Sequence, residues 1–189
     1  MAGRAGSDSE LVAQLRELHA ALTASELAYC LIGGVAVNAY GRVRGTLDLD
    51  LMIYSEAASQ AQQIVESLGF RSLAPGDDIA SYVRGNTRLD FLIARRPIAR
   101  DLLARAGTIE FGGDAIPVIP IEGLLGLKIQ AFNDNPSRLQ DLDDIVQLVR
   151  LHRDRLNLDE LRRYFRLFDR ESVLDDILRS TRDAGTDRS

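Results

Sequence analysis

The sequence has one cysteine in 189 residues, so an internal disulfide framework is excluded. Cys30 lies in an apolar stretch, which favours a small buried side chain over a reactive thiol. Long hydrophobic runs are also missing. No segment has the length of a membrane-spanning helix, and the first residues lack the apolar stretch of a signal peptide. We therefore expect a cytoplasmic protein with no membrane association.

Positive charge is the scarcer sign, with 23 basic residues against 28 acidic ones and a formal net charge of -5. This balance argues against a protein that coats polyanions, but it leaves room for a local basic patch. Lysine is almost absent: Lys128 is the only one, in an otherwise apolar helical stretch. A lysine is a compact point charge suited to a phosphate oxygen, and we favour that role over a surface lysine whose stem covers apolar neighbours.

The hydrophobic content of 46% suits one sizeable globular domain or a domain with a small appendage. Hydrophobic periodicity predicts an α/β part over residues 1–120 and a helical part over 121–189, with a disordered polar tail from about Thr181. The expected helices are 9–25, 35–40, 56–68, 97–106, 121–132, 137–152, 158–168 and 171–180. The expected strands are 27–32, 47–53, 79–84, 89–94, 108–111 and 115–119.

Two aspartates interrupt one of these strands. Asp48 and Asp50 are two residues apart, so their carboxylates leave the sheet by the same face. Buried and unpaired, each would cost several kcal/mol, roughly, to desolvate, and hard divalent ions such as Mg²⁺ prefer oxygen ligands of this kind. The alternative is a pair at a strand end, satisfied by caps or arginines. The apolar residues on both sides favour a metal site.

A glycine pair precedes these aspartates. Gly33 and Gly34 follow a predicted strand and open a predicted helix, a geometry that exposes backbone N–H groups to a phosphate. Tight turns also use glycine for conformational reasons alone. The pair gains weight from the carboxylates that follow, because a phosphate cradle and a metal site together can hold a metal-bound nucleotide.

Asp90 is a third carboxylate within a predicted strand. If that strand lies beside the strand of Asp48 and Asp50, Asp90 can complete the metal site and accept a proton from an attacking hydroxyl. The alternative is an internal ion pair with Arg88 or Arg84. The spacing alone leaves both interpretations open.

Further candidates lie in the preceding loop and in the helical part. Arg44 and Thr46 are the loop residues nearest the carboxylates and are candidate triphosphate contacts. Asp141 and Asp144 can orient Lys128 or a substrate group, but acidic residues near a helix start also suit the helix dipole.

The glycine pair, the spacing Arg44-x-x-x-Asp48-x-Asp50 and an aspartate in a later strand resemble the nucleotidyltransferase fold of the DNA polymerase beta superfamily. Within it, residues 27–150 are most similar to the bacterial AbiEii-like nucleotidyltransferase toxins. The segment that ends at Lys128 and the segment Arg138-Leu-Gln-Asp141-Leu-Asp-Asp144 are similar to the family's later motifs, although Gln140 stands where a basic residue is common.

The resemblance implies a mixed sheet followed by a helical bundle, and Mg²⁺-dependent transfer of a nucleoside monophosphate from an NTP, with release of pyrophosphate. Asp48, Asp50 and Asp90 would bind one or two metal ions, and Asp90 would alternatively act as base. The implied nucleotide contacts are Gly33, Gly34, Arg44, Thr46, Lys128 and Asp141.

The acceptor is not specified by these residues. Our first hypothesis is a toxin that modifies RNA, at the end of a tRNA, within a toxin–antitoxin or phage-defence pair with a cognate antitoxin. The second is a small-molecule nucleotidyltransferase acting on an aminoglycoside or lincosamide. The third is a catalytically silent protein that binds a nucleotide or a partner. Arg163, Arg166 and Arg170 form a stripe at helical spacing that can meet a nucleic-acid backbone or simply face solvent.

Overall fold

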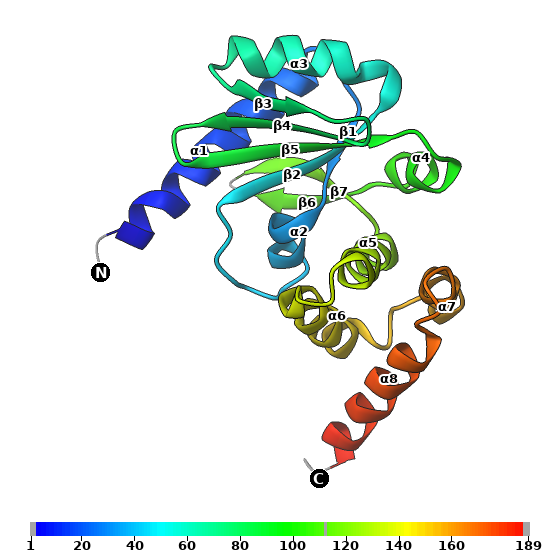
Figure 1. Ribbon diagram of the computed structural model, residues 1–189. Coiled ribbons are helices and arrows are strands. Elements are labelled where there is room, and N and C mark those ends of the chain that lie inside the picture. Colours follow the sequence, from blue (N-terminus) through cyan, green and yellow to red (C-terminus); the bar gives the residue numbers. More distant parts are fainter. Residues whose placement is uncertain (1–2, 112, 187–189) are drawn as a thin grey trace. The chain divides into compact units, whose positions relative to one another are not determined.

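A computed structural model describes residues 3–111 and 113–186 of the chain (Figure 1). Its described residues form a single seven-stranded sheet in the order β3-β4-β5-β2-β1-β7-β6, together with helices. Strand β2 runs parallel to β5 and β1 runs parallel to β7, whereas all other neighbours are antiparallel. The predicted α/β class with a mixed sheet is confirmed.

The strands are β1 (Tyr29–Leu31), β2 (Asp48–Tyr54), β3 (Arg71–Pro75), β4 (Ile79–Arg84), β5 (Thr87–Ala94), β6 (Gly107–Phe111) and β7 (Asp114–Val118). The helices are α1 (Gly3–Ala24), α2 (Gly33–Ala39), α3 (Ala58–Ser67), α4 (Pro97–Ala104), α5 (Ile121–Asp134), α6 (Leu139–His152), α7 (Leu158–Arg166) and α8 (Glu171–Thr186), and a short 3-10 turn, η1 (Ser55–Ala57), precedes α3.

Three predictions about these elements were wrong. Strand β3 was not expected, because it begins with polar residues and lies at the edge of the sheet, where no apolar run is needed. The first helix begins at Gly3 rather than at residue 9, since no proline interrupts the polar start. The last helix continues to Thr186, so its final turns replace the start of the predicted disordered tail.

Contacts divide the chain into two compact units. Unit 1 contains the residues up to Ala36 and Arg44–Ile119, and unit 2 contains Val37–Val43 and the residues from Pro120 onward. Helix α2 therefore begins in unit 1 and ends in unit 2. The sequence-based division into 1–120 and 121–189 stays a prediction.

The core of unit 1 lies between the sheet and its helices. Helices α1 and α3 pack against each other, and they contact β2 and β3 respectively (Figure 1). Their buried side chains include Leu18, Leu22, Ala61 and Val65. Cys30 in β1 is fully buried, as predicted. This packing fixes β2 and β5, the strands that carry the predicted carboxylates.

Unit 2 is built from helices. Helix α5 packs against α6 and α7, and α8 packs against α6 and α7. Apolar residues at helical spacing fill its core, including Leu124, Ile129, Ile145, Val149 and Phe165. Within the described residues, every helix is too short or too polar to traverse a lipid bilayer.

Candidate active site

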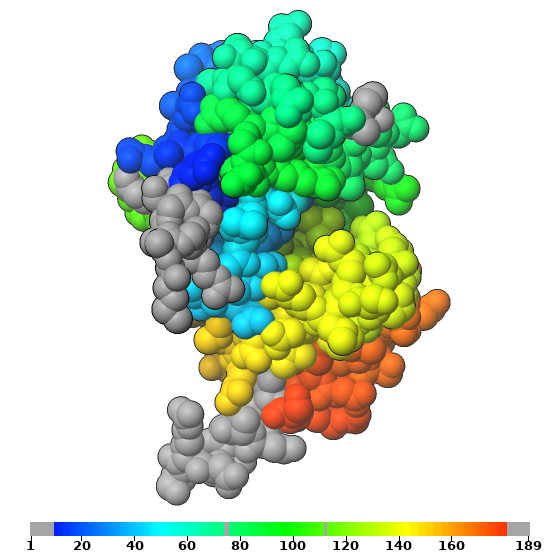
Figure 2. Space-filling model, turned by 60° about the vertical axis from the view of Figure 1, so that its left-hand side comes forward, coloured from blue at the N-terminus to red at the C-terminus, as the bar shows by residue number. Residues whose placement is uncertain are grey.

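The predicted carboxylates come together on β2 and β5 in unit 1. In the register of these parallel strands, Asp48 lies opposite Arg88 and Asp50 lies opposite Asp90. Because side chains alternate along a strand, these four residues share one face of the sheet, which we call the acidic face. Figure 2 shows the segment around residues 40–50, in light blue, at the molecular surface.

The acidic face is more open than the sequence predicted. Asp48 is exposed and Asp50 is partly buried, so the expected pair of buried carboxylates is not present. The reason is positional: Asp48 is the first residue of β2, where the strand emerges from its neighbours. A cation approaching this face therefore meets carboxylates that water still reaches.

Gly33 lies directly against Asp50. A Cβ added to Gly33 would be 2.5 Å from the Asp50 Cγ, and the Gly33 φ of +59° is in the left-handed region that favours glycine. The backbone N–H of Ile32 donates to the Asp50 carbonyl at 2.9 Å. Glycine is thus required here both by the backbone and by the close approach of a carboxylate.

Gly34 lies against the loop that leads into β2. A Cβ at Gly34 would be 2.6 Å from Thr46 Oγ1 and 3.4 Å from Arg44 Nη2. The glycine pair, the loop residues and Asp50 are therefore neighbours, as the nucleotide-site prediction required of them. Whether they bind a nucleotide stays a prediction.

Asp90 is held by Arg88 within the same face. The Arg88 Nε lies 2.9 Å from each carboxylate oxygen of Asp90, and Nη2 donates to Ser81 Oγ at 3.1 Å. The hydrogen bond to Asp90 raises the pKa of Arg88, and the charges of Asp90, Asp48 and Asp50 raise it further. The ion-pair alternative is therefore present in the structure, and the role of Asp90 as ligand or base stays a prediction.

The donor set of the acidic face consists of carboxylate oxygens, which suits Mg²⁺. Among the described residues, no three His, Cys, Asp or Glu side chains converge closely enough to hold a metal ion. Asp48 and Asp50 would hold the ion, and Asp90 would join them once its pair with Arg88 opens. The chemistry of this donor set suits a divalent cation, and its role as a metal site stays a prediction.

Lys128 lies in unit 2, in a buried ionic network. Its Nζ is 2.8 Å from Asp141 Oδ1 and 2.7 Å from Asp144 Oδ2, and its side chain is 6% exposed. Asp144 is fully buried and also accepts a hydrogen bond from Arg42 Nε at 2.8 Å. Two further pairs extend the network, Arg138 with Asp141 and Arg42 with Asp143.

The network gives Lys128 two carboxylate partners. Burial raises the pKa of Asp141, but hydrogen bonds from Lys128 and Arg138 outweigh it, and the net pKa is lowered. Lys128 is thus not a surface lysine, and its use as a phosphate contact, which stays a prediction, requires these pairs to open. Sequence reasoning did not identify Arg42 as a partner, because nothing local links it to residues about 100 positions away.

The predicted arginine stripe on α7 is partly neutralised. Arg166 pairs with Glu171 at 2.8 Å, and Arg170 Nε lies 3.2 Å from Asn133 Oδ1. Arg163 is exposed and has no side-chain partner among the described residues. The surface available to a phosphate backbone is therefore smaller than the sequence suggested.

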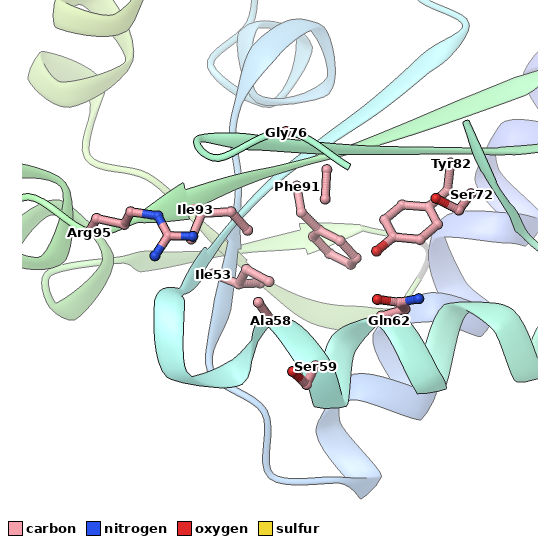
Figure 3. Close-up of a pocket in the computed structure, with 11 residues that line it drawn as sticks. Ile53, Ala58, Ser59, Gln62, Ser72, Gly76, Tyr82, Phe91, Ile93 and Arg95 are labelled. Carbon is pink, nitrogen blue, oxygen red and sulfur yellow. The ribbon is translucent and has the colours of Figure 1, made fainter. Parts of the chain in front are cut away.

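A pocket of about 360 Å³ lies on the opposite side of the sheet from the acidic face (Figure 3). Ile53, Phe91 and Ile93 line it, and these residues alternate with the acidic ones along β2 and β5. The 4% exposed ring of Tyr82 contacts Phe91 edge to face. None of the predicted site residues lines this pocket.

Solved structures similar to this chain include an adenylyltransferase and a nucleotidyltransferase-like protein. ANT(2'')-Ia, solved with adenylyl-2''-tobramycin, has a TM-score of 0.68 at 20% identity, over 84% of this chain and 96% of its own. An antigenic nucleotidyltransferase-like protein from Paracoccidioides brasiliensis has a TM-score of 0.61 at 20% identity, over 90% and 93%. The lincosamide adenylyltransferase LnuA has a TM-score of 0.51 at 17% identity, over 67% and 89%. At these identities the likeness shows the fold.

Among curated proteins, none matches the sequence. A family model does match residues 11–180, and its description is a nucleotidyl transferase of unknown function, DUF2204. That range contains the acidic face, the glycine pair and the buried network. The resemblance to the nucleotidyltransferase superfamily is confirmed, and this chain is an enzyme that belongs to the DUF2204 nucleotidyl transferase family.

Proposed function

We propose that the enzyme transfers a nucleoside monophosphate from an NTP to a hydroxyl group with the help of Mg²⁺. The observation that supports this proposal is the shared face of β2 and β5, where Asp48, Asp50 and Asp90 lie together and the Gly33 turn contacts Asp50. Asp48 and Asp50 would hold the ion. The ion would supply charge neutralisation and polarisation at the transferred phosphate.

The remaining steps belong to the protein's own residues. Asp90 accepts the proton of the acceptor hydroxyl. The hydroxyl oxygen forms a bond to the α-phosphorus as the bond to the bridging oxygen breaks, and pyrophosphate leaves with that electron pair. Arg44 and the backbone at Gly33 and Gly34 orient the triphosphate. Positioning and charge neutralisation are the main demands of this chemistry.

The test measures pyrophosphate release and transfer of label from each α-labelled NTP in the presence of Mg²⁺, with total RNA or an aminoglycoside and lincosamide mixture as acceptor. Asp48→Asn is expected to lower transfer by roughly 100-fold or more, the scale for loss of a key electrostatic group. Its thermal midpoint should match that of the wild type, because Asp48 is exposed. Unchanged transfer in Asp48→Asn would contradict the proposal.

A cationic small molecule is one candidate acceptor. The carboxylates of the acidic face would attract an aminoglycoside-like amine. The similar enzyme ANT(2'')-Ia was solved with an adenylylated tobramycin, and 96% of its length is matched. Label entering an aminoglycoside, with none entering RNA, would support this acceptor.

RNA is the second candidate, as expected of an AbiEii-like toxin with a cognate antitoxin. Arg150, Arg155 and Arg163 in unit 2 are exposed and have no side-chain partner among the residues described, so they are available to phosphates. Transfer to tRNA that weakens steeply with added salt would support RNA. If the toxin role holds, expression should also stop growth, and Asp48→Asn should relieve it.

A further inference from the structure

The acidic face contains its own cation. Arg88 lies two residues before Asp90 on β5 and directly opposite Asp48 on β2. Both carboxylate oxygens of Asp90 lie 2.9 Å from the Arg88 Nε. Ser81 on β4 accepts a hydrogen bond from the same guanidinium at 3.1 Å. The guanidinium is therefore held at two points on the face where a metal ion would bind.

This ion pair is weak enough to open. The Arg88 side chain is 51% exposed and that of Asp90 is 22% exposed, so water screens the pair. A divalent ion beside Asp48 and Asp50 repels the guanidinium and offers Asp90 a doubly charged partner instead. A buried pair would resist this exchange, but a half-exposed pair permits it.

We propose that Arg88 is a positioning residue that holds Asp90 in the metal-free enzyme and is displaced from it when a divalent cation binds. The proposal rests on the proposed function, since it takes the acidic face as the metal site. Arg88 competes with the ion for Asp90. It also keeps three like charges together while no ion is present.

The test measures Mn²⁺ binding without nucleotide, by the electron paramagnetic resonance signal of free Mn²⁺. Arg88→Gln is expected to bind Mn²⁺ roughly fivefold more tightly, the scale expected when a half-exposed ion pair no longer competes. Arg88→Lys should lie between the two, because lysine lacks the planar fork that matches a carboxylate. In an Asp90→Asn background, Arg88→Gln should have a much smaller effect.

Arg100→Gln is the matched control. Arg100 forms a two-point pair with Glu56, at 2.8 and 2.7 Å, outside the acidic face, and this pair is also solvent-exposed. Arg100→Gln removes the same positive charge as Arg88→Gln and should leave the Mn²⁺ affinity unchanged. That result would exclude net charge as the cause of the Arg88→Gln effect. In the wild type, Mg²⁺ should shift the Arg88 Nε–Hε resonance, assigned with Arg88→Lys, so the proposal remains testable if Arg88→Gln fails to fold.

The outcomes separate the two proposals. If the wild type binds Mn²⁺ and Arg88→Gln binds it equally or more weakly, Arg88 does not compete and this inference is wrong. An Arg88 resonance that Mg²⁺ leaves unmoved would also overturn it. If the wild type binds no divalent cation with or without NTP, the proposed function fails as well.

Discussion

The two ionic clusters of this protein differ in charge balance and in burial. The acidic face of unit 1 has three carboxylates and one guanidinium, and Asp48 is exposed. The network of unit 2 has three carboxylates and three cationic groups around Lys128, and its Asp144 is fully buried. We expect the solvated cluster to be the one that takes up a cation, as proposed above, and the buried one to be more sensitive to the loss of a single partner. Under the proposed function, the same residue types would serve binding in one region and structure in the other.

Removing one carboxylate from the buried network should have the largest effect on stability. Asp144 pairs with both Lys128 and Arg42, so Asp144→Asn removes one charged partner from each. Because the site is buried, we expect the free energy of unfolding to fall by about 3–5 kcal/mol. Chemical denaturation measures this loss.

Asp143→Asn is the control, because Asp143 also pairs with Arg42 but its side chain is 52% exposed. Its loss should cost about 0–1 kcal/mol. Equal costs for the two variants would show that burial does not distinguish this network from the acidic face.

Substitution of Gly33 should have the next largest effect, and it can separate a loss of stability from a loss of nucleotidyl transfer. Gly33→Ala strains a left-handed residue by about 1–2 kcal/mol and also pushes a methyl group against Asp50. Because a displacement near 1 Å in an active site can cost about 100-fold in rate, nucleotidyl transfer should fall on that scale.

Gly113→Ala also strains a left-handed residue, with φ at +90°, but an added Cβ there meets no atom of the described residues within 4 Å. It should lose comparable stability and retain transfer activity. If both variants lose activity to the same extent, the contact with Asp50 is irrelevant to the site.

The smallest expected effect is on pH dependence. The pKa of Asp141 is lowered in the folded protein, so its contribution to stability is fully present above the unfolded pKa of about 4 and is lost as pH falls through the folded value. The stability difference between wild type and Asp141→Asn should therefore shrink below about pH 4. Thermal midpoints measured from pH 7 to pH 3 test this, and a constant difference would contradict it.

The sequence predicted most of the fold because the decisive signals are local. Hydrophobic periodicity marked β2, β4 and β5, and the last two pair antiparallel in the structure. Edge strand β3 was missed, since it is defined by hydrogen bonds to β4 rather than by an apolar pattern of its own.

The candidate site was predictable in part for the same reason. Spacing placed Asp48 and Asp50 on one face, and the stated condition that the Asp90 strand lies beside theirs is met by the register of β2 and β5. The partner of Asp90 was left open, because the choice among nearby arginines depends on side-chain geometry. The pairing of Arg42 with Asp144 joins residues 102 apart, and no local pattern encodes it.

Helix α2 has a practical consequence for anyone who recombines this chain with a relative. Gly33–Ala36 belongs to unit 1, but Val37–Val43, with Arg42, belongs to unit 2. A crossover placed only after Ile119 would combine the Arg42 segment of one parent with the Lys128 and Asp144 of the other. A chimera that keeps the ionic network intact must therefore take residues 37–43 and the C-terminal helices from the same parent.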